Sequence, residues 1–470
     1  MSMMTTSAGR SRVPRSVVVL DVGATNVDVV QFSSEFQIID KCSTTSLRIP
    51  APPYLSLDAE SVINFALQSI QTFDQNVPVD AIVPCTHGSA VALLDGKGEL
   101  ALPVMSYLSP VPDHVAVAYK EIEPPFSEVF APTNPGALTV ARQLFWQEHE
   151  FPADFARVRT IMPYPQYIAF RLCGERSSDI SSLGAQTHLW APRDRSFSSL
   201  ARNRGWSTLI EPLRSAGDAL GPLRGIDLKG EGIVFCGIHD SSASFLQVAQ
   251  LEPVVLLSTG TWIIGFDTEA KLTSLDPLRD QVANVRPDGR PIASARFMGG
   301  EEFSMIAKVS GDAQPSLAAV QDLIDGGTMA LPSFTDSGGP IPGTGGRGVI
   351  IGPQPETEEG LVSLATLYVA LMTTQLLEGL GSTKLVLVDG VFAESKTFMA
   401  LLARLLPDRE VFSIQGTAGS AHGAASLVLQ DRAPRLKLKE IAAAKLRGLD
   451  DYREVWVEKA KKNQKNGVRQ

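Results

Sequence analysis

The hydrophobic positions of the chain follow two alternating patterns. Aliphatic runs of about five residues predict buried strands, and longer stretches with apolar residues three or four apart predict helices. The predicted strands are 16–32 (a hairpin), 79–84, 232–235, 254–257, 384–388 and 410–414. The predicted helices are 58–73, 134–150, 162–174, 362–380 and 396–406. Strands and helices that alternate in this way favour an α/β fold.

Two of the strands end in similar polar turns. Val17 to Leu20 stops at Asp21 and continues into Gly23-Ala24-Thr25-Asn26, and Val254 to Leu257 continues into Ser258-Thr259-Gly260-Thr261. Turns rich in backbone amides and hydroxyls are suited to binding phosphate oxygens. Because one turn lies near the start of each half, we expect a duplicated architecture that holds a nucleotide between two similar halves.

A third strand end carries a carboxylate. The strand 232–235 is followed by Gly237-Ile238-His239-Asp240, so Asp240 stands at a loop entry where an acid can face a cleft. An aspartate after a strand is often only a turn former or a helix cap. Because the second hydroxyl-rich turn follows closely in the chain, we interpret Asp240 as functional.

Composition narrows the class of protein. The chain has 470 residues, enough for two or three domains, and 44% hydrophobic with 20% charged residues is ordinary for a globular protein. A net charge of −9 argues against nucleic acid or an anionic membrane as the main partner, but not against ATP. The stretch 364–380 is apolar but interrupted by polar residues, so we expect no membrane span. Four scattered cysteines without a Cys-x-x-Cys pair predict reduced thiols and a cytoplasmic location.

Taken in order, the motifs resemble those of the FGGY carbohydrate kinases. The resemblance spans about residues 16–430 and rests on 21–27, 237–240, 258–262, 389–390 and 422–425. Residues 23–27 and the pair His239-Asp240 look most like the L-fuculokinase and L-rhamnulokinase branch. The resemblance implies an actin-like, ribonuclease H-like duplicated fold, with two domains and a cleft between them for ATP and sugar.

The resemblance also implies domain boundaries and roles for single residues. The domains would be a disordered tail (1–15), a sugar-binding domain (16–245), a nucleotide-binding domain (246–435), and a C-terminal helix and tail (436–470). Asp240 would be the catalytic base, and Asp21 and Asp240 would hold Mg²⁺. The nucleotide would contact Gly23, Ala24, Thr25, Asn26, Ser258, Thr259, Gly260, Thr261, Gly390, Ala393, Gly423 and Ala424. The sugar would contact Thr86, His87, Gly88, His239 and Asp240, with specificity set by 86–94, the surroundings of Tyr107, and 297–303.

Three positions depart from the family pattern. Asp28 stands where these kinases usually carry Arg or Lys, and an acid that faced ATP would repel its phosphates. Val388-Asp389-Gly390 replaces the usual three glycines at the adenosine turn, and Gln143 replaces a common lysine. These departures concern activity and leave the predicted fold unchanged.

The sequence therefore predicts an ATP- and Mg²⁺-dependent kinase of a ketose such as L-fuculose or L-rhamnulose. A pentulose, a tetrulose or a polyol stays open as the substrate, and a homodimer is the default assembly. A competing interpretation is a nucleotide- and sugar-binding sensor of the same fold that has lost catalysis, with Asp28 as the main argument. A third is an ATPase that drives a partner protein, which predicts sugar-independent hydrolysis. The residue that discriminates is Asp240, because a sensor does not need a base.

Overall fold

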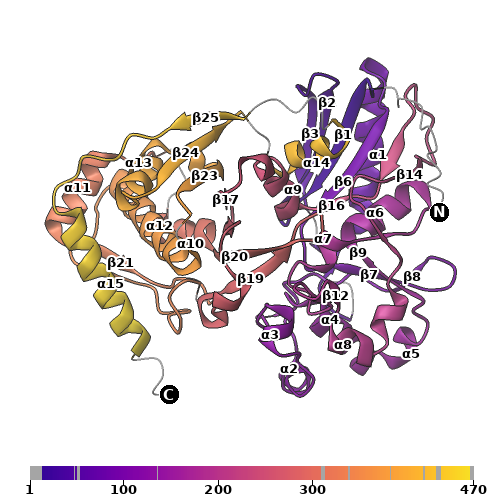
Figure 1. Cartoon of the computed structure of the whole chain (residues 1–470), viewed down its shortest axis with the longest axis horizontal. Coiled ribbons are helices and arrows are strands. Elements are labelled where there is room, and N and C mark those ends of the chain that lie inside the picture. The colour runs from indigo at the N-terminus through magenta and orange to yellow at the C-terminus, as the bar shows by residue number, and fades with distance from the viewer. Residues whose placement is uncertain are drawn as a thin grey trace, which may run out of the picture.

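The computed structural model describes residues 13–46, 48–49, 53–134, 136–308, 313–336, 339–381, 383–416, 419–429 and 436–465. Residues 1–12 of the predicted tail and 466–470 of the C-terminal tail lie outside the described residues, as do 417–418 of the predicted Gly/Ala-rich turn. Two seven-stranded mixed sheets form two halves that lie side by side (Figure 1).

The first sheet has the order β14-β15-β6-β1-β2-β3, with β16 also paired to β6. β1 starts an antiparallel meander with β2 and β3, and it runs parallel to β6 on its other side. β15 and β16 run parallel to β6, and β14 closes the edge antiparallel to β15. The strands are β1 (Ser16–Val22), β2 (Asn26–Ser33), β3 (Ile38–Thr45), β6 (Ala81–Thr86), β14 (Ala219–Pro222), β15 (Ile233–Phe235) and β16 (Ile238–His239).

The second sheet repeats this succession. β17 pairs antiparallel with β18, which is followed by β20 and β19, and on its other side β17 runs parallel to β23. β24 runs parallel to β23, and β25 closes the edge antiparallel to β24. The predicted duplicated actin-like fold is confirmed. The strands are β17 (Val255–Thr259), β18 (Ile263–Asp267), β19 (Gln281–Val285), β20 (Pro291–Phe297), β23 (Leu385–Gly390), β24 (Glu410–Gln415) and β25 (Lys437–Glu440).

Helices at matching positions cover the sheets. α1 (Ala59–Asn76) and α6 (Tyr164–Cys173) pack on the first sheet, and α12 (Glu358–Leu380) and α13 (Lys396–Leu405) on the second. Asp58 begins α1 by accepting a hydrogen bond from the Ser61 amide. α12 is the one helix of the described chain long and apolar enough to cross a membrane, but 89% of its apolar window is buried. It is therefore the central core helix of the second half.

Smaller elements complete the two halves. The first half adds β4 (Arg48–Ile49), β5 (Ser56–Leu57), β7 (Val91–Leu94), β8 (Leu100–Leu102), α2 (Asp113–Lys120), α3 (Phe126–Val129), α4 (Val140–Glu150), α5 (Pro152–Phe155), β9 (Thr160–Pro163), β10 (Ser178–Asp179), α7 (Ile180–Leu183), β11 (Trp190–Ala191), β12 (Ser196–Phe197), α8 (Ser199–Asn203) and β13 (Leu213–Arg214). The second half adds α10 (Gly299–Ala307), α11 (Leu317–Gly326), β21 (Met329–Leu331), β22 (Val349–Ile351) and α15 (Leu449–Lys465).

Most element boundaries shift by a few residues from the sequence predictions, and three differences are larger. α4 begins at Val140 rather than near residue 134, and the strand β9 precedes α6 where only a helix was predicted. The segment after residue 436 starts with the edge strand β25 before α15 begins. β25 was missed because all four of its side chains are exposed, so it has no buried apolar face to signal a strand.

Two helices, α9 (Asp240–Leu246) and α14 (Ser420–Leu429), join the halves. α14 lies between β24 and β25 of the second sheet in the chain, yet its small residues Ala421 and Ala424 pack in the same buried cluster as Val17 and Val19 of β1. α9 follows the first sheet, yet Phe245 packs with residues of the second sheet, including Leu256 and Phe266. Figure 1 shows α14 lying against the N-terminal strands, next to α9. Each half therefore contributes a helix to the other's packing.

The crossing of these helices requires a glycine. A Cβ atom at Gly423 would lie 1.7 Å from the carbonyl oxygen of Ala243, far inside van der Waals contact. We expect Gly423→Ala to lower the free energy of unfolding by about 3 kcal/mol, the upper end for overpacking, because a backbone atom must move. Gly326→Ala is the matched control, since its Cβ would meet nothing closer than 3.9 Å. Urea denaturation of both variants checks this, and equal stabilities would contradict it.

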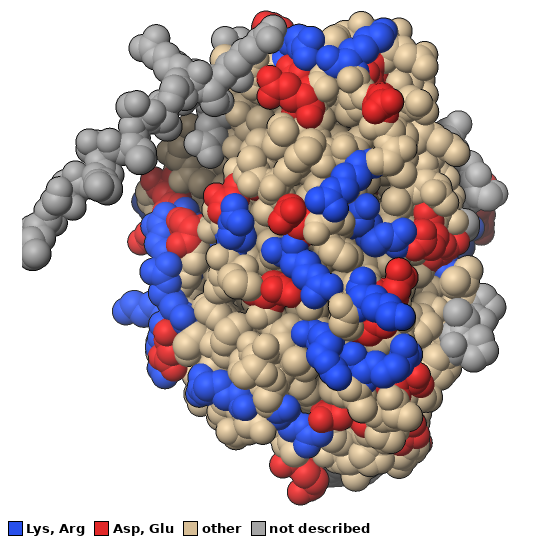
Figure 2. All heavy atoms as spheres, turned by 90° about the vertical axis from the view of Figure 1, so that its right-hand side faces the viewer, with Lys and Arg blue, Asp and Glu red and all other residues tan. Residues whose placement is uncertain are grey.

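Charged side chains of both signs share the outer face of the N-terminal half, and the cysteines are unpaired. Figure 2 shows the outer face of the N-terminal half, where cationic and anionic side chains are interspersed. Ion pairs such as Arg171–Glu60 and Arg214–Asp218 belong to this half. All four cysteines are free, and Cys85, Cys173 and Cys236 are buried.

Candidate active site

A cavity of about 280 Å³ opens between the two halves. This is close to the lower end of the roughly 300–1,000 Å³ that ligand pockets span. Its wall combines residues from the ends of β1, β6, β16, β17 and β20 with the starts of α9 and α14. The lining residues are Ala24, His87, Gly88, Ser89, Tyr107, Leu138, Ala185, Gln186, His239, Asp240, Ser241, Ser244, Ser258, Thr259, Gly260, Thr261, Trp262, Ile264, Arg296 and Ser420.

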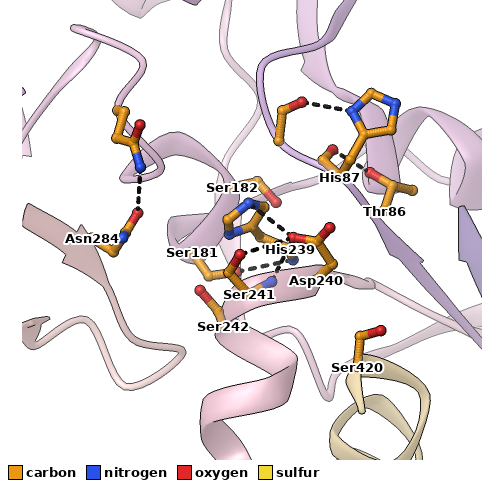
Figure 3. Close-up of polar contacts among 12 residues, drawn as sticks. Thr86, His87, Ser181, Ser182, His239, Asp240, Ser241, Ser242, Asn284 and Ser420 are labelled. Carbon is orange, nitrogen blue, oxygen red and sulfur yellow. Dashed lines mark hydrogen bonds and ion pairs between the residues drawn. The ribbon is translucent and has the colours of Figure 1, made fainter. Parts of the chain in front are cut away.

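Asp240 has one carboxylate oxygen fixed and one free. Oδ1 accepts hydrogen bonds from the Ser241 amide at 2.5 Å and from Ser241 Oγ at 3.2 Å, and His239 Nε2 lies 3.2 Å away. Among the described residues Oδ2 has no partner, and the side chain is 30% exposed to the cleft. Figure 3 shows Asp240 at the start of α9, surrounded by these groups. An oriented carboxylate with one free oxygen is suited to accepting a proton.

Gly237 and Gln166 hold the backbone just before Asp240 in place. Gly237 has φ +90°, and a Cβ there would lie 2.7 Å from the carbonyl oxygen of Pro84. The buried amide of Gln166 donates to the carbonyl oxygens of Cys236 at 3.2 Å and Gly237 at 3.0 Å. Gly237 therefore allows a turn with positive φ, in which a residue with a Cβ atom would be strained.

Two histidines in the cleft are held neutral by burial. Desolvation lowers the pKa of His239, which the Asp240 carboxylate only partly offsets, and desolvation also lowers the pKa of His87. His87 Nδ1 lies 2.7 Å from the Gly88 carbonyl oxygen, so Nδ1 carries the proton. A Cβ at Gly88 would lie 2.8 Å from His239 Nε2. Gly88 therefore gives His239 the room to approach Asp240.

Asp21 lies at the carboxyl end of β1 and is linked to the helix α14. Its Oδ2 accepts a hydrogen bond from Ser420 Oγ at 2.6 Å. Burial raises the pKa of Asp21 to about 7, the Ser420 hydrogen bond opposes this, and the nearby charges of Asp240 and Asp28 raise it further. The charge of Asp240 therefore acts on the buried carboxyl of Asp21, and the role of the two residues as a metal-holding pair stays a prediction.

The acid at position 28 forms an ion pair with a residue of a neighbouring strand. Lys41 Nζ lies 3.0 Å from Asp28 Oδ2, and Ser43 Oγ donates to Oδ1 at 2.5 Å. A second cation approaches the first turn from β4, since Arg48 Nη2 donates to the Ala24 carbonyl oxygen at 2.5 Å. The expected repulsion of phosphate by Asp28 is therefore offset by Lys41, and Arg48 brings positive charge to the turn.

The second polar turn is tied to β23. Thr259 Oγ1 donates to the Asp389 carbonyl oxygen at 2.6 Å and accepts from the Phe392 amide at 3.1 Å. A Cβ at Gly390, which has φ +89°, would lie 2.0 Å from the Thr259 carbonyl oxygen. The Thr259 hydroxyl is thus occupied in positioning the turn.

The structure gathers many of the predicted site residues, but not all of them. Ala24, His87, Gly88, His239, Asp240, Ser258, Thr259, Gly260 and Thr261 line the cavity. Asp21, Gly23, Thr25, Asn26, Gly390, Ala393 and Gly423 lie outside its lining. Thr86 and Ala424 were predicted as contacts, but both are fully buried, with the Thr86 hydroxyl bonded to the His87 carbonyl oxygen. Their side chains support the site and do not line it.

Some of the residues that line the cavity were not predicted from the sequence. Gln186, Arg296 and Ser420 were not predicted, and no residue of the expected 297–303 segment lines the cavity, although Tyr107 does. The signal for Arg296 is a charged residue inside the apolar run of β20, where burial requires a partner. Gln143, noted for its departure from the family, is buried and donates to the Ser89 carbonyl oxygen at 2.8 Å.

The donor set of the cleft fits Mg²⁺. The described residues contain no cluster of three or more His, Cys, Asp or Glu side chains that could hold a metal alone. Mg²⁺ at phosphoryl-transfer sites commonly uses one or two carboxylates, with substrate phosphates and waters as the other ligands. Asp240 lines the cavity. Asp21 does not, but it is hydrogen-bonded to Ser420, which does. These two residues would supply the carboxylates.

Comparison with known proteins agrees with this geometry. The family described as carbohydrate kinase FGGY, C-terminal domain, matches residues 251–436. An L-fuculokinase from Salmonella typhi is 26% identical over 263 residues, 53% of this chain and 55% of that protein. The chain thus spans about half the length of the curated relatives it matches.

Solved structures cover nearly the whole chain. A carbohydrate kinase from Novosphingobium aromaticivorans is 31% identical, with a TM-score of 0.83 over 96% of this chain and 99% of that chain. A glycerol kinase from Plasmodium falciparum, solved with ADP, shares the fold at 13% identity, with a TM-score of 0.74 over 97% of this chain and 99% of that one. The two halves repeat one sheet arrangement with a cleft between them, and a relative above 30% identity matches nearly the whole chain. The chain therefore belongs to the FGGY carbohydrate kinase family.

Proposed function

We propose that this protein transfers the γ-phosphoryl group of ATP to a hydroxyl group of a neutral ketose. The observation that carries the proposal is Asp240, whose free Oδ2 faces a cleft bordered by both polar turns. A kinase needs little covalent chemistry from its protein. It needs alignment, neutralisation of charge on phosphate oxygens, and one acceptor for the hydroxyl proton.

Asp240 acts as the general base. Its Oδ2 accepts the proton of the sugar hydroxyl while that oxygen bonds to the γ-phosphorus. The bond between the γ-phosphorus and the oxygen bridging it to the β-phosphate breaks, and ADP leaves with the electron pair. Neutral His239, with Nε2 3.2 Å from Oδ1, keeps the carboxylate oriented without forming a competing ion pair.

Asp21 and Asp240 would hold Mg²⁺, which neutralises charge on the phosphate oxygens when bound. Ser258, Gly260 and Thr261 border the same space, where hydroxyls and amides can bind phosphate oxygens. The relative solved with ADP supports a nucleotide in this fold. The proposal for Gly390, Ala393 and Gly423 as neighbours of the adenosine follows from the family resemblance.

The charges in the cleft favour a neutral substrate over a sugar acid. Among the residues that line the cavity in the described chain, Arg296 is the only permanent cation, and Asp280 lies 3.2 Å from its Nε. A carboxylate-bearing sugar would meet the charge of Asp240 without a free cation beside it. Similarity to L-fuculokinases supports L-fuculose or L-rhamnulose, and a pentulose, a tetrulose or a polyol is the alternative.

The experiment is a substrate panel read by ADP release with Mg²⁺-ATP. L-fuculose, L-rhamnulose, pentuloses, a tetrulose and glycerol form the test arm, and an aldonic acid forms the charged arm. We expect turnover with at least one neutral compound and none with the acid. If no neutral compound raised the rate of ADP release above the sugar-free rate, the proposal would be wrong. A cytoplasmic location and a homodimer stay predictions.

The sensor alternative loses its main argument, because Lys41 pairs with Asp28. ADP formation that does not depend on sugar would instead favour the ATPase interpretation. The panel therefore also separates the three classes of function.

A further inference from the structure

Arg296 is a buried cation in the cleft wall to which the proposed chemistry gives no role. It lies on β20 and is 6% exposed. A charge is rarely buried without a partner, and Asp280 is that partner. Their contact uses only the Nε side of the guanidinium, so other N–H donors can orient further groups.

Two of those donors cross to the N-terminal half. Nη2 donates to Asn134 Oδ1 at 2.5 Å, and Nη1 donates to Gln186 Oε1. Asn134 precedes α4, and Gln186 lies in the loop that follows α7. Because a guanidinium is planar with fixed donor directions, Arg296 fixes both amides relative to the second sheet.

The Gln186 loop is pressed against the second sheet. Gln186 has φ +60°, an uncommon conformation for a residue with a side chain, which persists where surrounding contacts hold it. A Cβ at Gly184 would lie 2.3 Å from Val285, and Gln186 Nε2 donates to Asn284 Oδ1 at 3.4 Å. Asn284 in turn donates to Ser294 Oγ at 3.0 Å. Figure 3 shows Asn284 on its strand beside the loop, across from the His239–Asp240 group.

Arg296 also contacts the residue that follows the second polar turn. Its Cζ lies 5.1 Å from the centroid of the Trp262 ring, within the range of a cation–π interaction. Trp262 and Gln186 both line the cavity. One side chain therefore touches two walls of the cleft that come from different halves of the molecule.

We propose that Arg296 is a positioning residue of the sugar subsite. It holds the Gln186 amide and the Trp262 indole as two walls of one pocket and so determines how tightly a neutral polyhydroxy compound binds. The inference rests on the proposed function. It goes beyond that function by naming the residue that assembles the subsite from both halves.

The test is Arg296→Lys. Lysine keeps the positive charge but lacks the planar guanidinium with its fixed N–H directions. Sugar binding is measured without ATP by tryptophan fluorescence, with L-fuculose, L-rhamnulose and glycerol as probes. We expect the Kd and the KM for the sugar to rise about 10-fold or more, while the KM for ATP changes less than about 2-fold. Acrylamide quenching of the ligand-free protein should also increase, because the guanidinium no longer covers the Trp262 indole. Trp262→Phe identifies the signal of this indole.

Arg290→Lys is the matched control, since Arg290 lies just before the same strand, is paired with Asp288 and is 58% exposed. It should leave all of these quantities unchanged. A lower melting temperature for Arg296→Lys with unchanged sugar Kd and KM overturns the proposal, because the ion pair is then only structural. Wild-type protein that binds a sugar without forming ADP overturns the proposed function alone, and the Kd comparison still decides on Arg296. No binding of any probe by the wild type overturns both.

Discussion

Replacing Asp240 with asparagine is expected to lower kcat by about 10²-fold to 10⁴-fold, the usual contribution of a general base. The amide can still accept the Ser241 hydrogen bonds through its oxygen, but it cannot take up the hydroxyl proton. Because the rest of the cleft stays in place, the sugar Kd should change little. Steady-state ADP release, with sugar binding followed separately by thermal shift, measures both effects.

The matched control for Asp240→Asn is Asp218→Asn. Asp218 also follows a turn in the N-terminal half, but it is 42% exposed and paired with Arg214 outside the cleft. Its replacement should leave kcat unchanged. If Asp240→Asn turned over sugar at a rate close to the wild type, the assignment of the base would be wrong.

Much of the fold was predictable because its strands are buried on both faces. β1, β6 and β17 are nearly continuous apolar runs, which is the pattern of a strand inside an α/β sheet. Their ends were recognisable because each stops abruptly in polar residues. Two parts of the structure gave no such signal, namely the exposed strand β25 and the crossing of α9 and α14. The crossing depends on Gly423 facing a carbonyl of another helix, which only three-dimensional packing shows.

The candidate site likewise has residues that the sequence could predict and residues that it could not. Asp21, Asp240 and the two polar turns were recognisable because each lies at the end of a strand, and strand ends share one edge of a sheet. Gln186 and Arg296 lie in the cleft wall because a loop of one half packs on the sheet of the other. No pattern within either segment encodes that contact. The sequence can therefore identify the chemistry of such a cleft more readily than the walls that select its substrate.

Asp21→Asn is expected to lower kcat by about 10²-fold or more while making the ligand-free protein more stable at alkaline pH. The catalytic loss follows because the amide is a poor ligand for Mg²⁺ and no longer offsets its charge. The gain in stability follows from the pKa of Asp21, which burial raises to about 7 from its usual value of 3.8. The folded protein thus binds this proton more tightly than the unfolded chain does.

The sign of the pH dependence follows from that difference. Below about pH 4 the carboxyl is protonated in both states, and its contribution to stability is fully present. As the pH rises toward 7, the folded state holds a proton that the unfolded state has released, so the free energy of unfolding falls. Above about pH 7 a charged, buried Asp21 lies beside Asp240 and Asp28, and the contribution is lost. An asparagine at this position removes the decline between pH 4 and 7.

Melting curves at pH 5 and pH 8 without nucleotide measure this effect. The wild type should lose a few degrees more than Asp21→Asn between the two values, and Mg²⁺-ATP should restore more stability to the wild type at pH 8 than at pH 5. Asp218→Asn is again the control, because that carboxylate is paired with Arg214 outside the cleft, and its removal should leave the pH dependence and the Mg²⁺ response intact. A variant at Asp21 that kept its activity, or that melted with the same pH dependence as the wild type, would show that this carboxylate neither holds the metal nor carries the raised pKa. The prediction thus ties catalysis and stability to one group, since the burial that destabilises the free carboxylate also prepares it to bind a cation.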